Sequence, residues 1–208
     1  MIAVIDYNVG NLASVSNAFK RQGMETVVTR DPELILKAQG IVLPGVGTFP
    51  VAMSHLEEYG LIDVLSQANE KNIPIMGICL GMQVLFKKGY EVEECNGLGF
   101  LEGSVQKLQV NAKIPHMGWN ELIFNQNHPL LSHIKEKDYV YFVHSFGAVC
   151  PDEELICYVE YGGSKIPALV GKGNVWGCQF HPEKSGEVGK KILKAFKELI
   201  EDVSDTSN

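Results

Sequence analysis

The sequence lacks long hydrophobic runs and an excess of basic residues. No stretch approaches the roughly 20 consecutive apolar residues of a membrane-spanning helix. Residues 1–6 have neither the basic flank nor the apolar stretch of a secretory signal peptide. The chain has 18 Lys and Arg against 25 Asp and Glu, a formal net charge of −7, which disfavours a nucleic-acid-binding surface. We therefore expect a cytoplasmic protein that binds a small polar molecule or another protein.

Paired cysteines are also missing. The chain has five cysteines, an odd number, at Cys79, Cys95, Cys150, Cys157 and Cys178, with no C-x-x-C spacing. This set fits neither a disulfide framework nor a zinc site. No group of Cys and His has the spacing of metal ligands, so we expect no metal and no cofactor. We interpret four of the five as packed free thiols and set Cys79 apart.

What the sequence does contain is the pattern of an α/β domain. Its 208 residues, 45% hydrophobic and 21% charged, suit an ordinary globular domain. Apolar strands are predicted at 2–5, 26–29, 40–43 and 75–78, alternating with helices at 11–21, 32–37, 49–69 (broken near Gly60) and 80–86. This alternation predicts an open, mostly parallel sheet flanked by helices, with ligands bound beyond the carboxyl ends of the strands.

The second half of the chain has a different pattern. Glycines and a proline punctuate residues 91–134, where short pieces such as 105–110 predict an antiparallel or mixed extension of the sheet. Further strands are expected at 139–143, 155–159, 168–170 and 175–179, and an amphipathic helix at 190–200. No repeat or linker divides the chain. We expect a single domain over residues 1–201 and a mobile tail at 202–208.

The segment Gly77-Ile78-Cys79-Leu80-Gly81 has the form of a nucleophile elbow in which cysteine replaces serine. Its glycines allow neighbouring backbone to approach, and the tight turn after a strand exposes the Cys79 sulfur. The helix that follows would direct its N-terminal amides at the sulfur and favour the thiolate. The alternative is a buried cysteine between packing glycines.

A second segment, Gln179-Phe180-His181-Pro182-Glu183, follows the strand expected at 175–179. Attack of cysteine on an amide needs a base that holds the thiolate and later protonates the departing nitrogen, and an imidazole does both. Two residues on, Glu183 projects to the same side of an extended chain and would hold the ring of His181. A lone histidine is more often structural, but this pairing at a strand end favours the catalytic interpretation.

A third segment, Pro44-Gly45-Val46-Gly47, follows the strand at 40–43. Acyl transfer needs backbone donors aimed at the oxyanion, and we predict that these are the N–H groups of Val46 or Gly47 and of Leu80. The alternative is a simple glycine-rich turn. Because glycine on both flanks permits a peptide flip, we hypothesise that this loop rearranges when a partner or substrate binds.

Together, GICLGMQ at 77–83, QFHPEKS at 179–185 and the glycine turn at 44–47 resemble class I, triad-type glutamine amidotransferases. Three further segments, DYNVGN at 6–11, PHMGWN at 115–120 and YFVHS at 141–145, are similar to one branch of that family. The glutaminases of this branch pair one-to-one with the cyclase of histidine biosynthesis, which makes imidazole glycerol phosphate. The resemblance spans nearly the whole chain and implies the open α/β fold of the family.

The resemblance also implies roles for individual residues. It assigns the catalytic triad to Cys79, His181 and Glu183, glutamine binding to Gln83, His144 and Ser145, and the cyclase-facing surface or ammonia passage to Met117, Trp119 and Asn120. For Met117 and Trp119, packing in the core is the alternative. Phe146 departs from the pattern, because an aromatic residue with a hydroxyl is expected there, so no polar role is expected of its side chain.

These residues predict a glutaminase mechanism. The Cys79 thiolate adds to the amide carbon of glutamine, His181 protonates the leaving ammonia, and water hydrolyses the thioester to glutamate. Ammonia released into water would be largely protonated, so we expect a separate subunit that consumes it. Three alternatives remain open: a glutaminase for another pathway, such as vitamin B6 or anthranilate synthesis, a non-catalytic subunit on the same fold, and a cysteine peptidase.

Overall fold

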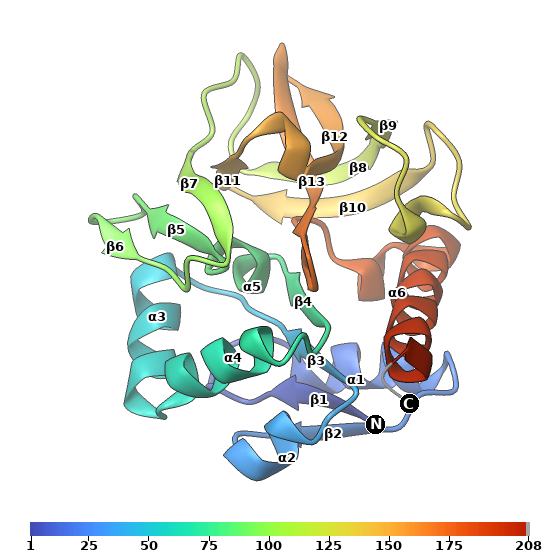
Figure 1. Ribbon diagram of the computed structural model, residues 1–208. Coiled ribbons are helices and arrows are strands. Elements are labelled where there is room, and N and C mark those ends of the chain that lie inside the picture. Colours follow the sequence, from blue (N-terminus) through green and yellow to red (C-terminus); the bar gives the residue numbers. More distant parts are fainter. Residues whose placement is uncertain (207–208) are drawn as a thin grey trace.

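The computed structural model describes the backbone of residues 1–206 and the side chains of residues 1–203, and an eight-stranded sheet lies at its centre (Figure 1). In spatial order the strands are β2 (Thr26–Thr29), β1 (Ile2–Ile5), β3 (Gly40–Leu43), β4 (Ile75–Ile78), β14 (Val175–Cys178), β13 (Ser164–Lys172), β12 (Leu155–Tyr161) and β9 (Ile123–Phe124). Neighbours from β2 to β14 pair in parallel, whereas β13, β12 and β9 pair antiparallel. The predicted open α/β sheet, mostly parallel with a mixed extension, is confirmed.

Helices cover both faces of the parallel part of the sheet. The buried cluster on one face joins Ile2 and Val4 to helices α1 (Leu12–Lys20) and α6 (Gly186–Thr206). The cluster on the other face joins Ala3 and Ile5 to α2 (Pro32–Leu36), α3 (Phe49–Glu58) and α4 (Leu61–Glu70). Successive side chains of a strand point to opposite faces, so a strand that is apolar throughout packs against both helical layers.

The helix predicted over 49–69 is two helices, α3 and α4, and the expected break at Gly60 is confirmed. Gly60 has φ +65, a left-handed conformation that glycine adopts without steric cost. The prediction of a helix over 80–86 is wrong in its second half. Helix α5 covers only Leu80–Gln83, and Phe86–Gly89 forms strand β5. Pairing of β5 with β7 (Leu101–Lys107) decides this, because a short apolar run fits a strand as well as a helix.

The helix predicted over 190–200 is longer in the structure, where α6 begins at Gly186 and reaches Thr206. Residues 202–206 of the expected tail therefore lie in a helix, and residues 207 and 208 lie outside the described part of the chain. Within that part, no helix has the length and apolar character needed to cross a membrane.

Two smaller sheets lie above the carboxyl ends of the parallel strands in Figure 1. One has the order β11 (Phe146–Val149), β7, β5 and β6 (Cys95–Asn96), and the other is a ribbon of β10 (Tyr139–His144) and β8 (His116–Glu121). Two 3-10 turns, η1 (Pro129–Leu131) and η2 (Asp152–Glu154), lie between the small sheets and the large one in the chain, and a third, η3 (Pro182–Lys184), lies between β14 and α6. The small sheets supply one wall of the site described next.

Candidate active site

Three loops meet because the strands before them are neighbours. Strand β4 lies between β3 and β14, with Gly77 opposite Leu43 and Ile78 opposite Cys178. All three strands run parallel, so the turns that follow them open at the same edge of the sheet. The Cys79 segment, the glycine turn at 44–47 and the His181 segment, which are distant in the sequence, therefore lie side by side.

Cys79 lies in a strained turn between β4 and α5. Its φ of 55° and ψ of −113° are unfavourable for a residue with a side chain, and such conformations cost about 1–3 kcal/mol. Backbone crowding explains the flanking glycines, since a Cβ at Gly81 would lie 1.7 Å from the carbonyl oxygen of Leu43 and one at Gly77 would lie 2.5 Å from that of Gly81. The turn leaves Cys79 with 8% exposure at the pocket wall. With a single turn, α5 gives the sulfur a few nearby amides and little of the expected helix dipole.

His181 and Glu183 form a buried pair. The Nδ1 of His181 donates a 2.8 Å hydrogen bond to Oε1 of Glu183, and their side chains are 5% and 3% exposed. Backbone contacts fix the ring position, because the N–H of His181 donates to the carbonyl of Tyr141 at 3.0 Å. With Nδ1 engaged by the carboxylate, Nε2 is the nitrogen left to interact with the sulfur of Cys79.

The charge state of His181 follows from these neighbours. Burial lowers its pKa, but the Cys79 sulfur and the Glu183 carboxylate outweigh burial and raise the pKa to about 9. The second oxygen of Glu183, Oε2, is buried without a hydrogen-bond partner among the described residues. The imidazolium of His181 is therefore the charge that compensates this carboxylate, and the ring is poised to give a proton at neutral pH.

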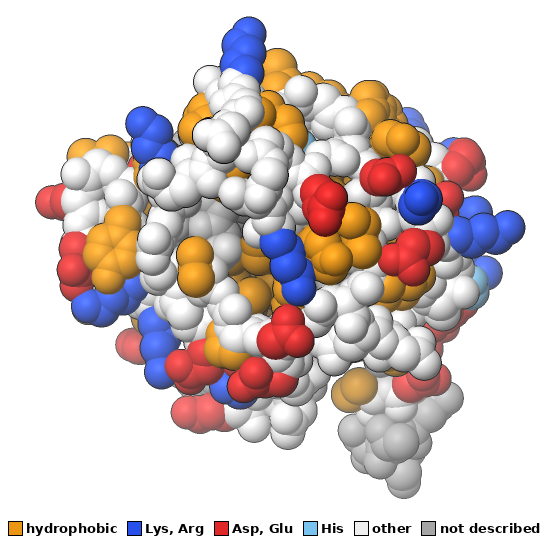
Figure 2. All heavy atoms as spheres, turned by 90° about the horizontal axis from the view of Figure 1, so that it is seen from above, with side chains coloured by type: hydrophobic (Ala, Val, Ile, Leu, Met, Phe, Trp, Pro, Cys, Tyr) orange, Lys and Arg blue, Asp and Glu red, His pale blue; other side chains and the backbone are white. Residues whose placement is uncertain are grey.

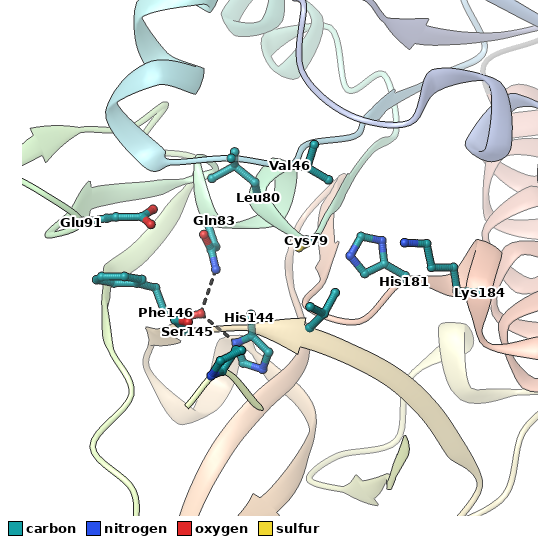
Figure 3. Close-up of a pocket in the computed structure, with 13 residues that line it drawn as sticks. Val46, Cys79, Leu80, Gln83, Glu91, His144, Ser145, Phe146, His181 and Lys184 are labelled. Atoms are coloured by element: carbon teal, nitrogen blue, oxygen red, sulfur yellow. Dashed lines mark hydrogen bonds between the residues drawn. The ribbon is translucent and has the colours of Figure 1, made fainter. Parts of the chain in front are cut away.

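A cavity of about 390 Å³ opens over Cys79 (Figure 3). Its walls include most of the predicted site residues, namely Val46, Gly47, Cys79, Leu80, Gln83, His144, Ser145 and His181. Glu183 is not among the lining residues and instead contacts His181. The predicted nucleophile, base, oxyanion donors and substrate-binding residues thus surround one space, which suits a free amino acid.

Sequence reasoning missed several residues of this site. Glu91 and Lys184 line the cavity and bring one charge of each sign to it, and Figure 3 shows them on opposite sides. Gln179 is fully buried, and its Nε2 donates to the Cys79 sulfur at 3.9 Å. Its place directly after the strand predicted to lead into the His181 segment is the sequence signal that could have identified it.

Two buried histidines are in contact at the pocket: His144 lines the cavity, and His116 lies behind it. The Nδ1 of His144 bonds to the carbonyl of Phe146 at 2.8 Å, and its Nε2 is 2.9 Å from Nδ1 of His116. His116 stacks between the rings of Tyr161 and Phe142, with centroids 4.0 and 4.6 Å away. Burial lowers the pKa of each histidine to about 4, so both are neutral at pH 7. Phe146 thus contributes a polar group through its backbone carbonyl. This contact does not depend on a side-chain hydroxyl, which the sequence pattern led us to expect here.

The three residues expected at a partner surface do not share one face of β8. Met117 and Trp119 are 60% and 55% exposed, so packing in the core does not account for them. Asn120 points to the opposite side, where its Nδ2 donates to the carbonyl of Glu160 at 3.2 Å and lies 3.4 Å from Nε2 of His116. Two adjacent apolar side chains therefore form the exposed surface, and Asn120 supports the buried histidines.

The sequence is similar to known proteins over nearly the whole chain. A family model described as Glutamine amidotransferase class-I matches residues 3–199. The chain is 58% identical to "Imidazole glycerol phosphate synthase subunit HisH" of Lactococcus lactis subsp. lactis, over 96% of this chain and 98% of that protein. It is 51% identical to the protein of the same name from Bacillus cereus, over 97% and 96% of the two chains.

Solved structures with low sequence identity share the fold. A crystal structure of a glutamine amidotransferase, 22% identical, has a TM-score of 0.76 and covers 97% of this chain and 100% of that one. PurLQS from Thermotoga maritima, 24% identical, has a TM-score of 0.74, covering 96% and 98% of the two chains. At these identities the likenesses show the architecture alone.

Proposed function

Because this chain belongs to the class-I glutamine amidotransferase family, we propose that it is the glutaminase subunit of an imidazole glycerol phosphate synthase. It hydrolyses glutamine to glutamate and supplies ammonia for histidine biosynthesis. The observation that carries this proposal is the position of Cys79, on a strained turn beside a histidine that a buried carboxylate holds. The two relatives named above, matched over nearly their full length, support the specific pathway.

The chemistry assigns one role to each member of the proposed triad. The Cys79 thiolate attacks the side-chain amide carbon of glutamine, and the C–N bond breaks as His181 passes its proton to the departing ammonia. Water then adds to the thioester while His181 accepts a proton, and glutamate leaves with the thiol restored. Glu183 keeps the ring oriented and stabilises its cation in both steps.

The oxyanion that forms in each step needs hydrogen-bond donors. The N–H groups of Val46 or Gly47 and of Leu80 are the proposed donors, supported by their place on the cavity wall with Cys79. Gly47 has φ +113, a conformation that only glycine adopts readily, so the loop suits the proposed rearrangement. Losing one such donor typically costs about 3 kcal/mol of transition-state stabilisation.

The pocket suits a zwitterionic amino acid. A free glutamine carries an ammonium and a carboxylate besides its side-chain amide, and Glu91 and Lys184 offer the complementary charges. Gln83, His144 and Ser145 are the proposed polar contacts along the rest of the molecule. A peptidase would instead need an extended groove for both sides of a peptide, which a cavity of about 390 Å³ lined by these residues does not favour.

We place a cyclase partner on the face of β8 that carries Met117 and Trp119. Large apolar side chains more than half exposed are typical of a protein contact, in which Trp is a frequent energetic centre, and Met117 pairs with Val143, which lines the pocket. Figure 2 shows that hydrophobic side chains gather in patches among charged ones on one face of the molecule. Docking beside the pocket would let ammonia pass to the partner without entering bulk water, in a one-to-one complex.

Glutamine hydrolysis by the purified chain, with and without a histidine-pathway cyclase and its nucleotide substrate, tests the proposal. We expect glutamate formation that increases when the cyclase is added and disappears in Cys79→Ala, whereas Cys95→Ala, which alters another free thiol, keeps its activity. A glutamine-like electrophile should label Cys79 stoichiometrically. Absence of both turnover and labelling would identify a non-catalytic subunit. Activation by the ammonia-using enzyme of another pathway, and not by the cyclase, would show that the chain serves that pathway.

A further inference from the structure

The carbonyl oxygen of Phe146 fixes the direction of a buried hydrogen-bond network. It accepts from Nδ1 of His144 at 2.8 Å and from Nε2 of Gln83 at 2.9 Å, as the dashed lines in Figure 3 show. A carbonyl oxygen only accepts, so the atom of Gln83 that faces it must be the amide nitrogen. This contact settles which way round the Gln83 amide lies.

The orientation passes from Gln83 to Gln179. The same Nε2 of Gln83 donates to Oε1 of Gln179 at 3.0 Å, so both of its hydrogens are engaged by protein acceptors. Gln179 therefore presents its oxygen to Gln83 and its own amide nitrogen to the other side. That nitrogen lies 3.9 Å from the Cys79 sulfur, at the long end of the range for a donor to sulfur.

Gln179 is held firmly in this place. The residue is fully buried, and its backbone N–H donates to the carbonyl of Ala168 at 2.9 Å. A buried glutamine with its polar groups satisfied is ordinarily structural. Here, however, the group it turns toward the sulfur is a donor, and a donor interacts more strongly with a thiolate than with a thiol.

We propose that Gln179 delivers an N–H donor to the Cys79 sulfur and thereby favours the reactive thiolate, in an orientation imposed by Gln83 and the Phe146 carbonyl. The inference rests on the proposed role of Cys79 as nucleophile. The same network orients the side-chain amide of Gln83. Its Nε2 is engaged by protein acceptors, so its Oε1 is left to accept hydrogen bonds from a bound ligand. The substrate-binding wall and the nucleophile are thus joined by two side-chain amides.

Other groups also face the Cys79 sulfur and must be kept constant in a test. The titratable neighbours are His181, Tyr7 and Cys178, and each interacts electrostatically with Cys79. Substitutions at Gln179 and Gln83 alter none of these groups and introduce no charge when the replacement is methionine, which has a similar volume.

The experiment follows alkylation of Cys79 by iodoacetamide against pH, with peptide mass spectrometry separating Cys79 from Cys95 and Cys150. We expect Q179M to react about tenfold more slowly than the unchanged protein at pH 7, with the midpoint of the pH profile about one unit higher. The matched control is Gln67→Met, which replaces an exposed glutamine on α4 and should react at the original rate. Thermal unfolding by circular dichroism checks that each variant is folded.

The double variant Q83M/Q179M tests whether Gln83 acts on the Cys79 sulfur through Gln179 or independently of it. The side-chain hydrogen bonds of Gln83 lead to the sulfur through Gln179. Q83M alone should therefore slow alkylation about threefold, and the double variant should match Q179M rather than multiply the two effects. Q83M also tests the inference if Q179M does not fold, because it frees the Gln179 amide to turn over. Alkylation of Q179M or folded Q83M within a factor of two of the original rate, or multiplied effects in the double variant, would overturn the inference. If Cys79 of the unchanged protein were no more reactive than Cys95, the proposed function itself would fail.

Discussion

The backbone N–H of Cys79 donates a 2.8 Å hydrogen bond to the carbonyl oxygen of Cys178. This bond continues the parallel pairing of β4 and β14 by one residue and sets the nucleophile turn directly against the segment that carries Gln179 and His181. The groups proposed to react therefore share one rigid sheet edge, and their relative positions depend on strand register rather than on flexible loops.

Adding a methyl group at Gly81 should damage this edge. A Cβ there would lie 1.7 Å from the carbonyl oxygen of Leu43, a backbone atom that cannot move without separating β3 from β4. We expect Gly81→Ala to lower the free energy of unfolding by about 3 kcal/mol or more, measured by urea denaturation. In the control, Gly173→Ala, φ is +58 with open space around the site, so we expect a loss of only about 1 kcal/mol. Equal losses in the two variants would contradict the crowding argument.

Removing the side chain of Cys79 should relieve backbone strain. With φ of 55° and ψ of −113°, this position suits glycine better than any residue with a Cβ. We expect Cys79→Gly to be more stable than Cys79→Ala by about 1 kcal/mol while both are inactive. Equilibrium unfolding of the two variants measures the difference, and a less stable glycine variant would show that the turn is unstrained.

Glu183→Gln should move the alkaline limit of activity. The raised pKa of His181, about 9, depends on the Cys79 sulfur and on the Glu183 carboxylate, so replacing that carboxylate with an amide lowers it. We expect the alkaline limb of the kcat/KM profile to shift down by about one pH unit, and kcat at pH 7 to fall by about 100-fold or more. A limb that stays in place would mean that Glu183 does not control the protonation of His181.

The neutral pair His116 and His144 should make stability depend on pH in the mildly acidic range. Each folded-state pKa is about 4, below the usual 6.5, so the unfolded chain binds more protons between these values. The contribution of the two neutral histidines to the free energy of unfolding is complete above pH 6.5 and is lost as pH falls toward 4. The free energy of unfolding then decreases by about 1.4 kcal/mol per pH unit for each proton.

The variant His116→Phe isolates one of these protons. Phenylalanine keeps the stack between Tyr161 and Phe142 but does not titrate, and it leaves Nε2 of His144 without its partner. We expect lower stability at pH 7 and a slope of unfolding free energy between pH 5 and 6.5 reduced by about one proton. Urea unfolding at several pH values provides the measurement, and an unchanged slope would show that His116 is protonated in the folded state.

The parallel half of the sheet could be predicted because local sequence decides it. Strands such as β1 and β3 are apolar throughout, and helix signals such as the capping side chains of Asn11 and Asp31 lie between them. Strands β8 and β11 carry no comparable pattern: His116–Glu121 mixes polar residues and a glycine with two exposed apolar side chains, and Phe146–Val149 contains a glycine. These strands exist because of the partners they pair with.

The sequence by itself determined the chemistry of the site: a cysteine between glycines after a strand, a histidine two residues before a glutamate, and a glycine turn. These are local patterns, and each limits the backbone and the reactivity of its own segment. Only the tertiary structure decided that the three segments meet, that Gln179 faces the sulfur, and that Asn120 turns away from Met117 and Trp119. The reason is that pairing and burial across the whole sheet set the register between strands that are distant in sequence. They also decide to which face each side chain points.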